Sequence, residues 1–324
     1  MQLKAMWANN SPSSKFLLTI GMAIIGGFLF SIVAFGLASV VYGVDPTQLE
    51  GLLNDLDNPL AIDVLKLIQT ISEIGTFILP ALFLAYTFGS SAPDYLSLNR
   101  KPNRISIISV FILLIAAVPL INFIGDLNSR MVLPSWLAGL ERQMKATEEQ
   151  AALITEKFLQ INSPFQFVYA MVMIAVLPAL GEELLFRGIL QRIFSEWSGG
   201  KHTGVWATAI LFSAMHMQFY GFVPRMLLGV MLGYLYLWSG SLWLPILAHF
   251  INNGAAVIAS YLYKQNLITM NPDTIGTGND YVALVVSTGI TSGLLWLLYK
   301  RGQLQKITAG QQEDAVNQGP NGPD

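Results

Sequence analysis

Long apolar runs recur along almost the whole chain, separated by short polar stretches. One helix needs about 20 apolar residues to cross the hydrocarbon core, and backbone groups in lipid must be hydrogen-bonded within the protein. The runs are too long and too uniformly apolar for barrel strands. They therefore predict an all-α polytopic integral membrane protein with about eight transmembrane helices, at roughly Phe16 to Tyr42, Leu65 to Phe88, Ile105 to Ile124, Phe165 to Phe194, Thr203 to Phe219, Phe222 to Trp238, Leu242 to Tyr263 and Tyr281 to Tyr299.

Composition supports a membrane protein and excludes several kinds of chemistry. Of the 324 residues, 53% are hydrophobic and 12% are charged, which is about half the charged fraction of a soluble domain. A net charge of −2 gives no reason to expect nucleic acid as a partner. The chain has no cysteine, which excludes disulfides, thiolate catalysis and cysteine-ligated metal.

The loops predict the orientation of the helices. The connection from Gly43 to Ala61 is acidic, whereas the next one, from Gly89 to Arg104, carries Arg100, Lys101 and Arg104. Basic loops face the cytoplasm, so we expect both termini to be cytoplasmic in a multi-pass protein of a bacterial inner (plasma) membrane. Arg225, on a short outer turn, is an exception to this rule.

The chain is expected to fold as one membrane domain with polar ends. Residues 1–15 form a cytoplasmic N-terminus, residues 16–301 the transmembrane domain, and residues 302–324 a polar tail whose composition predicts disorder. In the long outer connection, Gly125 to Ser163, apolar residues recur at helical spacing. This predicts a helix lying at the membrane interface, and the alternative is that the helix at 135–160 gates substrate access.

Ionisable residues inside a membrane span are costly and call for a reason. The fourth span contains two adjacent glutamates, Glu182 and Glu183, followed by Arg187. Glu183 and Arg187 stand four residues apart and can pair on one helix face. Glu182 points about 100° away, so a self-neutralising pair does not account for it.

Two of the three histidines also lie inside predicted spans. His216 ends the motif from Phe212 in the fifth span, and His249 is followed four residues later by Asn253 in the seventh. Glu182 and both histidines lie about 13 to 22 Å along their helices from the same end, which is compatible with one pocket. A carboxylate, two imidazoles and an amide suit water activation and oxyanion stabilisation. Ser213 lies in no nucleophile-elbow pattern.

Three ordered motifs, Glu182-Glu183-x-x-x-Arg187, Phe212-x-x-x-His216 and His249-x-x-x-Asn253, resemble those of the type II CAAX prenyl endopeptidases. The related bacterial CAAX-protease and bacteriocin-processing group, also called the Abi family, shares them. The resemblance covers a core at about 165–263. It implies that Glu182 and His216 orient and deprotonate water, that His249 and Asn253 stabilise the oxyanion, and that Glu183 and Arg187 support the site.

The resemblance predicts an intramembrane endopeptidase acting on membrane-anchored peptides, with prenylated CAAX substrates in the eukaryotic branch. The family is often labelled metalloprotease, and Glu182, His216 and His249 could ligate zinc. No HExxH helix is present, and a metal-free, glutamate-dependent protease is the preferred interpretation. The alternatives are a proton-coupled transporter and a noncatalytic immunity or scaffold protein of the same fold.

Overall fold

The computed structural model describes residues 3–269, 274–277 and 280–317. Within these residues, six helices are long and apolar enough to cross a membrane. Two of the six are composite: α3, η2 and α4 make one helix, and α8, η4, α9, η5 and α10 make another. The six helices span Pro12–Tyr42 (α1), Pro59–Phe88, Arg104–Ser129 (α6), Pro164–Ser198, Phe222–Ser239 (α12) and Tyr281–Gln305, which belongs to α14 (Tyr281–Asn317).

The other two expected spans are helical but less suited to crossing lipid by themselves. α11 (Lys201–Met215) has 15 residues and is about 22 Å long, shorter than a hydrocarbon core of about 30 Å. α13 (Trp243–Lys264) is longer but carries His249, Asn252 and Asn253. The protein is thus an all-α, multi-pass membrane protein, and the count of eight spans remains a prediction.

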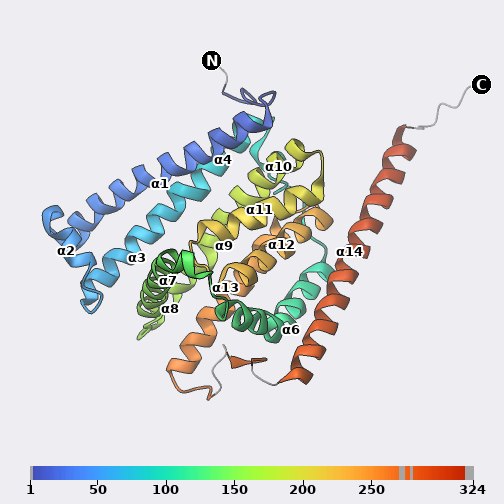
Figure 1. Ribbon diagram of the computed structural model, residues 1–324. Helices are drawn as coiled ribbons and strands as arrows, with labels where there is room; N and C mark the ends of the chain where they lie inside the picture. Colours follow the sequence, from blue (N-terminus) through green and yellow to red (C-terminus); the bar gives the residue numbers. More distant parts are fainter. Residues whose placement is uncertain (1–2, 270–273, 278–279, 318–324) are drawn as a thin grey trace, which may run out of the picture.

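The helices form three groups (Figure 1). α1 packs against α3 (Pro59–Glu73), η2 and α4 (Leu79–Phe88) on one side, and α6 pairs with α14 on the other. The segment from α9 to α13 lies between these two groups and contains all the predicted site residues. The start of α1 and the end of α14 lie at the same end of the bundle (Figure 1), and the cytoplasmic placement of both termini remains a prediction.

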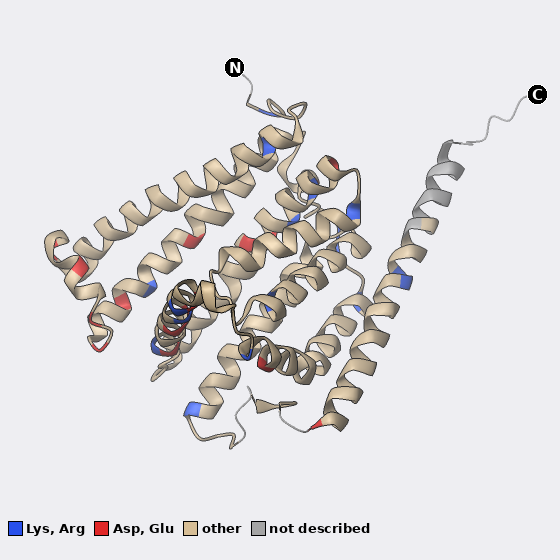
Figure 2. Ribbon diagram, viewed as in Figure 1, with Lys and Arg blue, Asp and Glu red and all other residues tan. Residues whose placement is uncertain are grey.

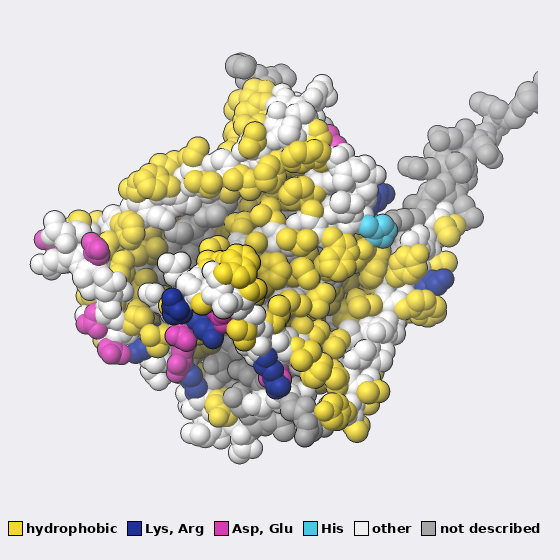
Figure 3. Space-filling model, in the orientation of Figure 1, with side chains coloured by type: hydrophobic (Ala, Val, Ile, Leu, Met, Phe, Trp, Pro, Cys, Tyr) yellow, Lys and Arg dark blue, Asp and Glu magenta, His cyan; other side chains and the backbone are white. Residues whose placement is uncertain are grey.

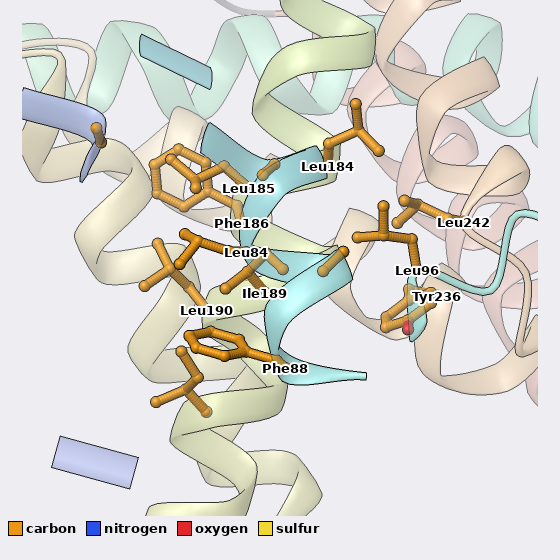
Figure 4. Packing of buried hydrophobic residues seen from close by; sticks show 14 of the residues in the cluster. Leu84, Phe88, Leu96, Leu184, Leu185, Phe186, Ile189, Leu190, Tyr236 and Leu242 are labelled. Atoms are coloured by element: carbon orange, nitrogen blue, oxygen red, sulfur yellow. The ribbon is translucent and has the colours of Figure 1, made fainter. Parts of the chain in front are cut away.

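The apolar core surrounds the π-helical segment η5 (Leu184–Leu190). Leu185, Phe186 and Ile189 of this segment are almost fully buried, and they pack with Leu84 and Phe88 of α4 (Figure 4). The outward faces are also apolar (Figure 3), with large exposed side chains along α1 and α6. In lipid, both the core and the outer surface of a protein can be apolar. The buried polar residues therefore identify the interior better than the hydrophobic ones do.

Charged side chains gather near helix ends and along α7 (Ala138–Phe158), whereas a few lie deep in the bundle (Figure 2). The amphipathic helix expected in the outer connection is therefore present as α7. Of its apolar stripe, Met144, Ala151 and Ile154 are partly buried and Phe158 is buried against Ile62 and Met173, whereas Leu140 is exposed.

α14 continues through Asn317, so residues 302–317, expected to be disordered, are described as helix. The segment contains several good helix formers, Gln, Lys, Glu and Ala among them, and its first proline is Pro320. The polarity of this segment therefore did not predict its disorder correctly, because a polar sequence without proline can continue a helix in water.

Two prolines explain the wide helical turns beside the site. The π-helical segments η2 (Ile74–Ile78) and η4 (Met171–Val176) each end two residues before a proline, Pro80 and Pro178. Proline has no N–H, and its ring crowds the carbonyl four residues earlier. A π-turn relieves this crowding locally, and such turns are frequent at functional sites.

The Gly229-x-x-x-Gly233 pair of α12 allows close helix packing, as the sequence suggests. A Cβ at Gly229 would lie 3.1 Å from Ala209 of α11, and one at Gly233 would lie 2.9 Å from Gln191 Oε1. The carbonyls of the two glycines accept from Arg187 Nη2 (3.0 Å) and Gln191 Nε2 (3.2 Å). α12 is thereby joined to η5 and α10 (Gln191–Ser198).

Glu183 and Arg187 form the predicted pair at 2.9 Å, and both side chains are fully buried. The Arg187 guanidinium also lies 4.8 Å from the centre of the Phe212 ring of α11. Glu183 Oε1 accepts a second hydrogen bond, from His249 Nδ1 of α13 at 2.9 Å. This cluster joins the π-helical segment to α11, α12 and α13.

We expect Arg187→Met to destabilise the protein by about 3–5 kcal/mol, because removing one partner leaves the other charge buried and uncompensated. Denaturant unfolding in detergent measures the change. The matched control is Arg130→Met, which removes an i,i+4 pair with Asp126 in which the Arg130 side chain is 67% exposed, and it should leave stability nearly unchanged. Equal stability of Arg187→Met and the wild type would contradict this account.

Candidate functional site

The site is a pocket of about 340 Å³ between α6, α9 (Leu177–Glu183), α11, α12 and α13. Its lining includes Glu182, His216, His249 and Asn253. The four residues to which the sequence assigned the chemistry are therefore brought together. The two assigned a supporting role, Glu183 and Arg187, lie behind the pocket in the buried cluster.

Glu182 is the carboxylate that faces the pocket. It is 9% exposed, and its Oε2 has no hydrogen-bond partner among the described residues. His249 Nε2 lies 3.9 Å from this oxygen, which is beyond hydrogen-bond distance. Buried polar atoms are rarely left unpaired, so this oxygen is available to a water molecule or a substrate in the pocket.

Both histidine rings are held through Nδ1. His249 Nδ1 lies 2.9 Å from Glu183 Oε1, and His216 Nδ1 lies 2.8 Å from the Phe212 carbonyl. These acceptors require the hydrogen at Nδ1, which is an assignment from the hydrogen-bond network. Each neutral ring therefore keeps a lone pair at Nε2, where it can accept a proton or hold a metal.

Asn253 has less free donor capacity than the sequence suggested. Its Nδ2 donates to the Ile174 carbonyl at 3.0 Å, and its Oδ1 accepts from Asn252 Nδ2 at 3.1 Å. Ile174 lies four residues before Pro178, which has no N–H to offer its carbonyl. One Asn253 hydrogen thus supports the broken helix, and the second remains for the pocket.

Sequence reasoning missed three residues at or beside the site. Asn252 and Arg225 line the pocket, and Glu73 of α3 lies beside Gly181, where a Cβ would approach its Oε1 to 3.2 Å. Arg225 is a basic residue on a predicted outer turn, and this exception to the positive-inside rule could have indicated a functional role. Glu73 lies within the second predicted span, where an acid is costly, and its Oε1 has no partner among the described residues.

The loop between α11 and α12 is fixed by the outer connection. Tyr220 donates from its backbone N–H to Glu148 Oε2 at 2.9 Å and from its hydroxyl to Glu141 Oε1 at 3.1 Å. Both acceptors belong to α7. The loop begins at His216 and leads into α12, whose first turn carries Arg225. Movement of α7 would disturb the pocket, although gating by this helix remains a prediction.

Ser213 is structural. Its Oγ donates to the Phe222 carbonyl at 2.7 Å, and the residue is fully buried. This agrees with the sequence, which gave no nucleophile pattern around it.

The donor types in the pocket suit zinc, since two imidazoles have Nδ1 held by acceptors and a carboxylate oxygen is unpaired. In the part of the chain that the structure describes, however, no three His, Asp or Glu side chains are placed to hold one ion. Glu182, His216 and His249 therefore do not fit a zinc site as they are arranged here.

Comparison with known proteins places the same residues in one family segment. Residues 164–255 match the family described as Type II CAAX prenyl endopeptidase Rce1-like. The uncharacterized protein YpbD of Bacillus subtilis (strain 168) is 33% identical over 84 residues, which are 25% of this chain and 40% of the relative. The search of solved structures gave no match.

The matched segment runs from the start of α8 (Pro164–Ala170) into α13 and so contains all six predicted site residues. The aligned part spans less than half of YpbD. The resemblance that the three motifs indicated is thereby confirmed for residues 164–255, which carry a domain similar to the Rce1-like type II CAAX prenyl endopeptidases.

Proposed function

We propose that this protein is an intramembrane endopeptidase in which Glu182 activates water to cleave a peptide bond of a membrane-associated substrate. The observation that carries the proposal is Glu182 Oε2, a buried carboxylate oxygen without a partner beside two imidazole rings. The family's description, a CAAX prenyl endopeptidase, supports the reaction class.

The proposed reaction needs no covalent intermediate. Glu182 takes one proton from water as the water oxygen bonds to the carbonyl carbon, while His216 Nε2 accepts a hydrogen bond from the second water hydrogen, which stays on the oxygen. The oxyanion receives hydrogen bonds from the second Asn253 hydrogen and from His249 Nε2, after this nitrogen has taken up a proton from solvent. Glu182 then protonates the leaving nitrogen, the C–N bond breaks, and an acid and an amine result.

An apolar cavity of about 400 Å³ adjoins the pocket and supports a lipid-modified or strongly apolar substrate. The two share Ile121, Pro224 and Leu228 as lining residues. Apart from Tyr234 and Thr291, the cavity lining is apolar, and its volume lies within the range of about 300–1,000 Å³ typical of ligand sites. A hydrocarbon chain attached near the scissile bond would have a place beside Glu182.

Arg225 supports a substrate that ends in a free carboxylate. Its Nη2 donates to Gln218, whereas Nη1 is buried without a partner among the described residues. A guanidinium binds a carboxylate through charge-assisted hydrogen bonds. A CAAX motif ends at the C-terminus of the substrate, so the terminal carboxylate of the substrate lies within a few residues of the scissile bond. When that bond lies beside Glu182, the carboxylate would be within reach of the same pocket.

One observation favours the transporter alternative. Glu73 is 5% exposed and lies beside the helix of Glu182 with its Oε1 unpaired, as in a proton relay. Proton uptake into proteoliposomes that requires Glu73, in the absence of any peptide cleavage, would favour a transporter over the protease.

We expect Glu182→Gln to lower kcat/KM by about 100-fold or more, because general-base catalysis contributes about 10²–10⁴-fold. The assay is cleavage of a fluorogenic prenylated peptide by detergent-purified protein. Glu149→Gln, at an exposed position on α7, is the control that should keep full activity. Thermal unfolding should show that both variants remain folded.

A zinc chelator should leave the wild-type rate unchanged. Loss of activity that added zinc restores would make zinc the water activator. Cleavage by Glu182→Gln at the wild-type rate would rule out the proposed role of this carboxylate.

Arg225→Gln should raise KM for a substrate with a free C-terminal carboxylate by about 10-fold or more, since a hydrogen bond to a charged group is worth about 1.5–3 kcal/mol. The same peptide with a C-terminal amide should show no such change. Steady-state kinetics on this matched pair of peptides gives both values. Equal losses on the acid and the amide would show that Arg225 only supports the pocket.

A further inference from the structure

A second polar cavity, of about 360 Å³, lies at the opposite end of α11 from His216. Lys201 begins α11 and His216 follows its last residue, so about 22 Å of helix separates the two sites. The described residues that line this second cavity include three cations, Arg100, Arg192 and Lys201, and no carboxylate. The cavity is therefore strongly positive.

Arg192 is built into the wall of the cavity. Its guanidinium lies 5.0 Å and 5.7 Å from the ring centres of Tyr95 and Tyr236. It donates to Tyr236 Oη at 2.9 Å and to Ser97 Oγ at 2.8 Å. Since both hydroxyl oxygens already accept from Arg192, their own hydrogens remain to be donated elsewhere.

Arg100 and Lys201 supply the exposed positive charges of the cavity. Both side chains are exposed, and neither forms an ion pair among the described residues. The nearby Glu196 carboxylate is taken by Lys15 at 3.1 Å. The cavity thus offers two charged groups and two hydroxyl hydrogens to an anion with several oxygens.

The cavity lies at the end of the bundle where the basic loops gather. It is bordered by the link before α6, the first turns of α10, the start of α11 and the end of α12. Exposed tryptophans lie close by in sequence, Trp197 at 53% and Trp243 at 42% exposure. Tryptophans concentrate at the membrane interface, and basic pockets between helices on the cytoplasmic side bind anionic headgroups.

We propose that this cavity binds a phosphate group, and its place at the interface points to the headgroup of an anionic phospholipid. Phosphate oxygens would accept from Arg100, Lys201 and the Tyr236 hydroxyl, and Arg192 would hold that hydroxyl in place. The proposal is independent of the proteolytic activity.

Native mass spectrometry of the full chain in detergent tests the proposal, with short-chain phosphatidylglycerol, phosphatidylcholine and inorganic phosphate as probes. We expect phosphatidylglycerol to bind the wild type at least 10-fold more tightly than phosphatidylcholine. Arg100→Gln/Lys201→Gln should weaken phosphatidylglycerol about 10-fold or more. The control Lys145→Gln/Lys157→Gln, which removes two lysines from α7, should not.

Tyr236→Phe provides a second variant that keeps the aromatic ring and removes one donor, and it should weaken the same lipid several-fold. Equally weak binding of both lipids and of inorganic phosphate, or an unchanged Kd for phosphatidylglycerol in Arg100→Gln/Lys201→Gln, would overturn the site. Tight binding of inorganic phosphate with no preference between the lipids would overturn the lipid as its source.

Discussion

The buried charge of Glu183 is the constraint on which the rest of the site depends. A carboxylate inside a membrane protein is costly unless donors surround it, and Glu183 takes its donors from two different helices. Arg187 and His249 both bind its Oε1 at 2.9 Å. The same bonds fix the position of α13 and the proton on His249 Nδ1, so the stability of the bundle and the chemistry of the pocket depend on one atom.

Proline adds a second constraint, because it breaks the backbone hydrogen-bond pattern close to Glu182. Pro178 leaves the Ile174 carbonyl without its usual donor, and Asn253 supplies one from α13 at 3.0 Å. A residue that would stabilise the oxyanion is thereby held by the defect in the neighbouring helix. The position of Asn253 therefore depends on a proline that takes no part in the reaction.

Local spacing predicted those features that depend on one helix. The Glu183–Arg187 pair followed from an i,i+4 interval, and the absence of a local partner for Glu182 followed from its 100° offset. Contacts between helices could not be predicted in the same way. The bond from Glu183 to His249, and the places of Asn252, Arg225 and Glu73, depend on how separate helices are packed. That Glu182, His216, His249 and Asn253 share one pocket was predicted mainly from the resemblance to a known family.

The helix boundaries show where hydropathy alone is insufficient. α11 reads as a span because it is apolar, yet 15 residues are too few to cross the core by themselves. Its last residue is followed by His216, which is exposed and lines the pocket together with the buried Phe212. The end of this short helix thus presents an imidazole to the pocket.

A series of contacts along α12 sets the position of Glu182 along the bundle. Arg187 binds the Gly229 carbonyl, Gln191 binds the Gly233 carbonyl, and Arg192 binds the Tyr236 hydroxyl. The three contacts join one continuous helix to another at successive turns, so neither helix can slide along the other without losing all of them. Arg192 lies at the basic end, ten residues after Glu182, or about 15 Å along the helix. The contacts therefore hold Glu182 at a fixed distance along its helix from the basic end, and this distance would set the depth at which the proposed peptide substrate must reach the pocket.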